Sequence, residues 1–112
     1  ITGVDAQGSP VATQLPLFLQ QRGNKKLLRG HMMKHMDHQV AFEQNEKALA
    51  VFTGPWSYVS ARWYTNPSRA STVNYMSAHV HGSLRFLGED ALAEILQLTT
   101  LYFEKVYFPI LY

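Results

Sequence analysis

Short strand-like segments divided by turn residues are the feature of this 112-residue chain that most restricts its fold. Glycine, proline and polar runs recur between apolar stretches of strand length, and only one late stretch has the period of a long helix. This alternation is typical of small β-proteins with tight turns. The chain is long enough to bury one core, so we expect a single domain over residues 1–112.

The expected elements follow from these local signals. We predict strands at residues 1–4, 11–19, 26–30, 47–53 and 72–87, with one further strand within the aromatic segment at 56–64. We also predict a hairpin loop at residues 20–25, a short helix within residues 31–42, and a longer helix from residue 88. Acidic residues open the longer helix, and Leu92, Ile95 and Leu96 belong to its apolar stripe. Pro16 predicts an edge or a bulge, Gly54-Pro55 predicts a strand end, and Gly82 predicts a second bulge. The continuous apolar run at 47–53 predicts a strand buried on both faces. The order indicates a small antiparallel barrel or sandwich with helices at its edges.

Composition excludes several classes of protein. The chain has no cysteine, which excludes a disulfide scaffold, a thiolate zinc site and a thiol nucleophile. A net charge of +2 without clustering is weak support for nucleic acid binding. No apolar run approaches a membrane span and no secretory signal begins the chain, so we expect a cytoplasmic protein. Because the chain begins at Ile1, we expect it to be processed or truncated.

Residues 29–34 form a candidate anion site. Arg29 and Gly30 end a predicted strand, and Lys34 lies in the predicted first turn of a helix. Free backbone N–H groups at a helix start attract anions, and a lysine adds a full positive charge. The pattern is compatible with a phosphate cradle, but taken alone it favours the alternative, a plain strand-to-helix connection with a solvated lysine.

The histidines are weaker candidates for chemistry. His31, His35 and His38 would share a face if all three were helical, but Gly30 suggests that His31 precedes the helix, so we expect no metal site. His79 and His81 alternate along a predicted strand. Histidines so placed more often pack or donate hydrogen bonds than bind a ligand.

The segment at residues 54–64 is dense in aromatic side chains, with two interleaved serines. Such a segment fills a core or an oligomer interface, or it lines the site of a flat polar ligand. No nucleophile elbow, Walker loop or dinucleotide-binding fingerprint occurs elsewhere, and no residue is an evident general base. Catalytic residues therefore stay unassigned.

Taken together, these segments resemble the PaiB-type family of FMN-binding transcriptional regulators. The matching stretches are residues 13–17, 28–31, 48–55, 56–64 and 74–82, with the run Gly-Pro-x-x-Tyr-x-Ser-x-x-Trp-Tyr at 54–64 as the most specific. Gln14 stands where the family usually has histidine, and the chain is shorter than family members at both ends.

The resemblance implies a mainly β fold with flanking helices, namely a truncated FMN-binding split β-barrel related to pyridoxamine phosphate oxidase. It implies a homodimer with FMN at the interface. Backbone groups of Thr13, Gln14, Leu15 and Pro16 would face the flavin ring, while Arg29, Gly30, His31 and Lys34 would hold the phosphate. Ser57, Tyr58, Ser60, Trp63, Tyr64, Asn74 and Tyr75 would line the ring or the ribityl chain, partly from the other subunit.

The implied activity is flavin-dependent redox chemistry or ligand sensing in transcriptional regulation, with any electron transfer carried by the flavin. Direct contact with nucleic acid stays open but is not indicated by the charge. The alternative is a non-catalytic or haem-binding split-barrel dimer, with His31 or His79 as the axial ligand.

Overall fold

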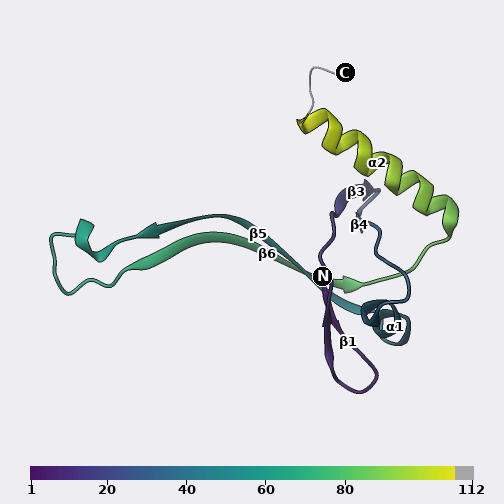
Figure 1. Cartoon of the computed structure of the whole chain (residues 1–112), viewed down its shortest axis with the longest axis horizontal. Helices are drawn as coiled ribbons and strands as arrows, with labels where there is room; N and C mark the ends of the chain where they lie inside the picture. The colour runs from purple at the N-terminus through teal and green to yellow at the C-terminus, as the bar shows by residue number, and fades with distance from the viewer. Residues whose placement is uncertain (108–112) are drawn as a thin grey trace.

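The computed structural model describes residues 1–107 of the chain. Six strands, two α-helices and one short 3-10 helix follow one another in this part (Figure 1). Their bounds are β1 Thr2–Val4, β2 Pro10–Ala12, β3 Phe18–Arg22, β4 Lys25–Arg29, α1 Asp37–Gln44, β5 Lys47–Val59, η1 Ala61–Trp63, β6 Thr72–Ser83 and α2 Glu89–Tyr107. The prediction of a mainly β protein with flanking helices is confirmed.

The strands of residues 1–107 fall into two antiparallel sheets. One has the order β2-β1-β5-β6 and the other is the hairpin β3-β4. The β1–β2 hairpin closes through Asp5, whose carboxylate accepts hydrogen bonds from the backbone N–H groups of Gln7 and Ser9. Gly8 and Gly23 have positive φ angles at the turns of the two hairpins, where glycine carries no steric cost.

The strand predicted at 11–19 is in fact two. β2 ends at Ala12 and β3 begins at Phe18, so the segment from Thr13 to Leu17 belongs to neither sheet. Proline cannot donate a ladder hydrogen bond, which is consistent with the interruption around Pro16.

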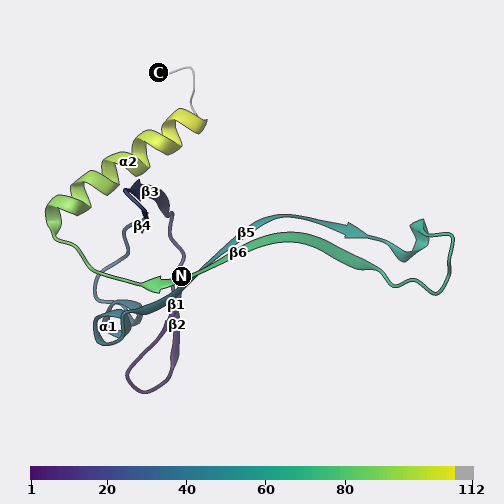
Figure 2. The same cartoon turned by 180° about the vertical axis from the view of Figure 1, so that it is seen from behind.

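β5 and β6 form a long two-stranded ribbon that projects from the rest of the molecule (Figures 1 and 2). We call residues 47–83 the arm. The predicted strand end at Gly54-Pro55 is wrong, because β5 continues to Val59 and accommodates these residues in a bulge between Thr53 and Trp56. Gly82 pairs regularly with Ala48, so the predicted bulge there is also wrong.

The predicted burial of residues 47–53 on both faces is wrong as well. Ala50 is buried, but Val51 and Phe52 are 41% and 36% exposed. Only Thr2 of β1 pairs with β5, at Leu49, so the described chain offers the arm almost no sheet beyond its base. Residues 72–83 of β6 are exposed along their whole length.

α1 begins at Asp37, later than the sequence pattern predicted. His31 to Met36 form the connection from β4, with His35 at a positive φ angle. Lys34 therefore precedes the helix and is not in its first turn. The first turn carries the acidic Asp37 instead, so the predicted cradle at a strand-to-helix junction is not formed there.

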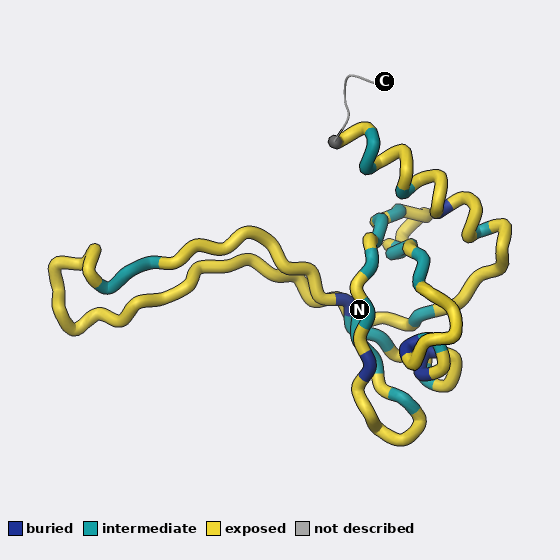
Figure 3. Tube along the Cα trace, in the orientation of Figure 1, coloured by how far each residue is buried: buried dark blue, intermediate teal, exposed yellow. Residues whose placement is uncertain are grey.

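The packed core is small and lies where α1 meets the β1–β2 hairpin. Val11, Ala41 and Phe42 are buried there, and partly buried apolar side chains surround them. A Cβ atom on Gly3 would lie 2.9 Å from Cζ of Phe42, so glycine is needed at this contact. Figure 3 shows how few positions of the trace are buried, and that most of the arm is exposed.

α2 begins at Glu89, as its acidic first turn and apolar stripe predicted. It lies beside the β3–β4 hairpin, where the rings of Phe18 and Tyr102 meet edge to face at 5.4 Å. Ile95 is buried, whereas Leu92 and Leu96 of the same predicted stripe are exposed. No helix in the described part of the chain is long and apolar enough to cross a membrane.

The molecule is far more extended than a compact domain of its size. Its radius of gyration is 19.1 Å, whereas about 13 Å is typical of 112 compact residues. Its accessible surface is 9354 Å², against roughly 6,200 Å² for a folded monomer of this mass. The excess is concentrated in the arm, which the rest of the described chain does not cover (Figure 3).

Candidate functional site

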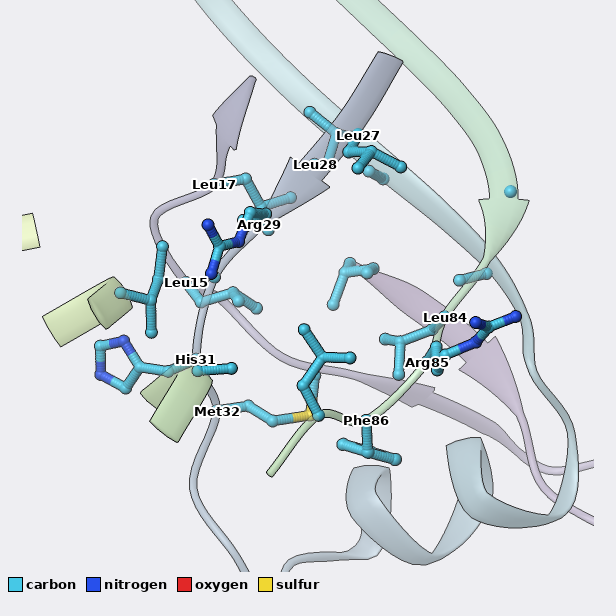
Figure 4. Close-up of a pocket in the computed structure, with 18 of the residues that line it drawn as sticks. Leu15, Leu17, Leu27, Leu28, Arg29, His31, Met32, Leu84, Arg85 and Phe86 are labelled. Atoms are coloured by element: carbon cyan, nitrogen blue, oxygen red, sulfur yellow. The ribbon is translucent and has the colours of Figure 1, made fainter. Parts of the chain in front are cut away.

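A cavity lies between β4, the end of β6 and the start of α2. Its volume is about 770 Å³, within the range of small-molecule sites. Leu27, Leu84, Met32 and Phe86 face its interior, while Arg29 and His31 lie along one side (Figure 4). The cavity combines an apolar lining with an excess of basic residues. Its basic residues are Lys26, Arg29, Lys34 and Arg85, and its acidic residues are Glu43 and Glu89.

A second cavity of about 450 Å³ adjoins the first. Thr13, Gln14, Leu15 and Pro16 line it, and Leu15 and His31 line both cavities. Thr13 exchanges reciprocal backbone hydrogen bonds with Ile1, the residue before β1, at 2.8 and 2.9 Å. The structure thus brings the predicted ring-facing segment beside the predicted phosphate-binding residues.

Gly30 lies at the contact between the segment at residues 13–16 and the predicted phosphate-binding residues. A Cβ atom at this position would lie 2.6 Å from the carbonyl oxygen of Pro16 and within 3 Å of the side chains of Leu15 and Leu17. The close approach of the two backbones therefore depends on glycine. We call residues 13–16 and 29–34 the cleft half of the candidate site.

Arg29 is already paired within the chain. Its two terminal nitrogens donate to the two carboxylate oxygens of Glu94 on α2, at 2.9 and 3.0 Å. Hydrogen bonding and charge attraction within this pair raise the pKa of Arg29 and lower the pKa of Glu94. The Arg29 side chain is 13% exposed, so this guanidinium is held in place at the cavity wall.

The histidines lie in different parts of the structure. His38 is buried on α1, and its Nε2 lies 3.2 Å from the backbone oxygen of Met33. His31 and His35 precede that helix, so the three do not share a helical face. His79 pairs with Val51 on the exposed arm and lines neither cavity, whereas His81 lines the larger one.

The remaining predicted site residues lie on the distal part of the arm and line neither cavity. They are Ser57, Tyr58, Ser60, Trp63, Tyr64, Asn74 and Tyr75. Ser57 pairs with Asn74 across the ribbon, and Tyr75 pairs with Trp56. We call this group the arm half of the candidate site. Figure 1 shows that the arm carries it away from the cleft half, so one chain does not bring the two halves together.

One member of the arm half has a local structural role. The Ser60 hydroxyl accepts a hydrogen bond from the backbone N–H of Arg62 and so caps η1. Ser71 supports the same turn by accepting from the N–H of Ala61 at 2.9 Å. The end of the ribbon is therefore a defined turn that presents Trp63 and Tyr64 on the surface.

Comparison with known proteins gives these two halves a context. The family model described as "Putative FMN-binding domain" matches residues 2–108. The chain is 34% identical over 99 residues to the "Protease synthase and sporulation protein PAI 2" of Bacillus subtilis (strain 168). This alignment covers 88% of the chain and 47% of the relative, so the chain spans about half the length of that protein.

The chain belongs to the PaiB-type family of FMN-binding proteins. Its cofactor is FMN. No solved structure matches the chain.

The described residues of this PaiB-type protein fit FMN in two parts. The cleft half offers cations for a phosphate, since Arg29, His31 and Lys34 all line the larger cavity. Among the Phe, Tyr and Trp side chains that the structure describes, only Phe86 lines either cavity. Aromatic and hydroxyl groups suited to a planar ring are gathered in the arm half, which the arm carries away from these cations (Figure 1).

Two features of this site escaped prediction from the sequence. Glu94 lies 65 residues from Arg29, and no local pattern connects them. The second is visible in the sequence itself, because residues 47–88 contain no Asp or Glu and four of the ten Lys and Arg residues. The rest of the chain, which we call the body, holds all eight acidic residues and six basic ones. Residues 47–88, which we call the arm region, and the body therefore carry opposite net charge.

Proposed function

We propose that the protein binds FMN in a site shared by two copies of the chain. The cleft half of one copy would hold the phosphate and one face of the cofactor. The arm half of the other copy would cover the flavin ring. The single observation that carries the proposal is the separation of the two halves within one chain, although each half has the chemistry that part of the cofactor needs.

The exposed arm independently supports a second copy. Trp56, Trp63, Tyr75 and Met76 are each about 70% exposed, which is unusual for large apolar side chains gathered on one element. An isolated two-stranded hairpin is marginally stable in water. A second copy that covers the ribbon would stabilise it, and the acidic body of that copy would attract the basic arm region.

The same arrangement would account for a split barrel. The strands of one chain form two separate sheets in residues 1–107. Two copies related by a two-fold axis would place an arm of each against the cleft of the other, as an isologous interface requires. The excess accessible surface, roughly 3,000 Å² per chain relative to a compact monomer, is large enough for a stable dimer.

The chain's residues would bind and orient the cofactor. Lys34 and Arg29 would attract the phosphate dianion, the segment at residues 13–16 would present backbone groups, and the arm would exclude water from the ring. FMN supplies electron transfer in one- or two-electron steps when it is bound. The relative's name refers to protease synthase and sporulation, and we propose for this chain a role in regulation that depends on FMN, through its redox state or a sensed ligand.

A nucleic acid is the competing partner for the arm. A two-stranded ribbon can enter the major groove, and residues 47–88, which include this ribbon, contain no acidic residue. Four Lys and Arg residues spread over residues 47–88 give few phosphate contacts, which makes a second copy the better partner. A gel shift at physiological salt separates the two, since arm-dependent retention of a duplex by a monomer would favour nucleic acid.

The test of the proposed function is an FMN titration combined with sedimentation. We expect flavin fluorescence to change on binding, with one FMN per chain and a dimer as the binding species. Lys34→Ala in the cleft half and Tyr58→Ala in the arm half should each weaken binding at least about tenfold, as expected for loss of a charge or of a stacked ring. A protein that fails to bind added FMN contradicts the proposal, and so does tight binding by a monomer.

A further inference from the structure

Arg29 holds the most enclosed guanidinium of the cavity wall. It ends β4, its side chain is 13% exposed, and it lines the larger cavity. Both terminal nitrogens are engaged by the carboxylate of Glu94, and one of them also lies 3.4 Å from the amide oxygen of Gln20. The end of the guanidinium that recognises anions is therefore occupied from within the chain.

A carboxylate that accepts two parallel hydrogen bonds from a guanidinium uses the same fork that a phosphate would use. Two anions cannot occupy that fork together, and their charges repel. A phosphate entering the cavity must either displace Glu94 or bind without Arg29. The pair thus sets the affinity of the cavity for anions.

Glu94 lies on α2, which makes few contacts with the other elements described in residues 1–107. Ile95 is the buried residue of α2 among those described, and Leu96 and Leu98 are 43% and 42% exposed. The edge-to-face contact of Phe18 with Tyr102 and the Glu94–Arg29 pair join the helix to the β3–β4 hairpin. Elements with few buried contacts open at low free-energy cost, so α2 can move as a unit.

We propose that Glu94 is a built-in competitor for the anionic group of the ligand, and that anion binding at Arg29 releases Glu94 and loosens α2 from the β3–β4 hairpin. The inference rests on the proposed function in taking this anion to be the phosphate of FMN. Beyond the proposed function, Glu94 would set the affinity for the ligand. Occupancy of the cavity would then be coupled to the position of α2.

The first test uses inorganic phosphate as the probe and calorimetry of the full chain. Glu94→Gln should bind phosphate about two- to fivefold more tightly than the wild type, the range expected for loss of an ion pair whose carboxylate is exposed. Asp90→Asn is the matched control, because it removes the same charge from α2 and Asp90 has no ion pair within residues 1–107. The gain should vanish in the Arg29→Gln background, where Glu94 has no guanidinium to compete for.

The second test needs no variant. Saturating phosphate should speed hydrogen exchange at the α2 amides of the wild type, because release of Glu94 removes one of the helix's anchors. Equal phosphate affinities of Glu94→Gln and Asp90→Asn would overturn the inference, as would an absence of phosphate binding or α2 exchange unchanged by phosphate. If phosphate behaves as expected while FMN binds no variant, the competitor stands and the proposed cofactor site fails.

Discussion

Replacement of Trp56 by serine tests whether a second copy covers the arm. Trp56 is 71% exposed in the single chain, as is Tyr75 opposite to it on the ribbon. A surface substitution of this kind changes the stability of a monomer by only about 0.5 kcal/mol. A large effect on assembly would therefore have to come from contacts that one chain does not contain.

The expected magnitude follows from the exposed area. A tryptophan buries about 150–250 Å² when fully covered, and the 71% that is open here corresponds to roughly 3–4 kcal/mol at about 25 cal/mol per Å². A symmetric dimer contains the contact twice. Even one such loss raises the dimer dissociation constant by about 140- to 700-fold.

Sedimentation equilibrium over a range of concentrations measures this constant directly. Leu19→Ser is the matched control, because Leu19 is 66% exposed but lies on β3, away from the arm. We expect Trp56→Ser to shift the protein towards monomer and Leu19→Ser to leave it dimeric. An unchanged constant for Trp56→Ser, or a wild type that is monomeric at every concentration, would refute the reasoning.

Three further predictions concern the body of the molecule. Gly30→Ala places a Cβ against the carbonyl oxygen of Pro16, so we expect it to lower the unfolding free energy by about 1–3 kcal/mol and to weaken FMN binding, as read by thermal unfolding and titration. Phe42→Ala removes a buried ring from the small core and should destabilise the chain by about 3–5 kcal/mol, seen as a lower urea midpoint. Because Arg29 lowers the pKa of Glu94, the pair should persist at neutral pH and be lost only in acid below the usual range of a glutamate, as carboxyl NMR titration would report. A Glu94 midpoint in the usual range, or an FMN affinity unaffected by Gly30→Ala, would contradict the corresponding prediction.

Elements governed by local signals were predicted well. The start of α2 follows from its acidic first turn and apolar period, and the β3–β4 turn lies within the predicted hairpin loop at residues 20–25. β5 was predicted too short, because a proline normally ends a strand and only the register with β6 reveals the bulge that tolerates Pro55. Strand pairing is a non-local property, so no window of the sequence contains it.

Burial was the least predictable property. The run at 47–53 looks like a strand covered on both faces, yet Val51 and Phe52 are exposed within one chain. Apolar patterning reports the faces that a sequence is suited to bury and does not say which chain covers them. The same mismatch between pattern and exposure is what makes the arm a candidate interface.

The candidate site was predicted in composition but not in arrangement. The cleft half gathers because Gly30 packs against Pro16 and Leu15, a contact between segments that both carry recognisable motifs. The partnership of Arg29 with Glu94 joins residues far apart in sequence and required the structure. Local motifs identify the chemical groups of the candidate site. The topology determines that one chain brings together only the cleft half.

Complementation between two defective chains tests the shared site most directly. One chain carries Lys34→Ala with Arg29→Ala in the cleft half, and the other carries Tyr58→Ala with Tyr75→Ala in the arm half. Each alone should bind no FMN. After unfolding and refolding as an equal mixture, half of the dimers are mixed and hold one intact site each, which gives about one FMN per four chains. No recovery of binding in a mixture that forms dimers would contradict a site shared between two copies.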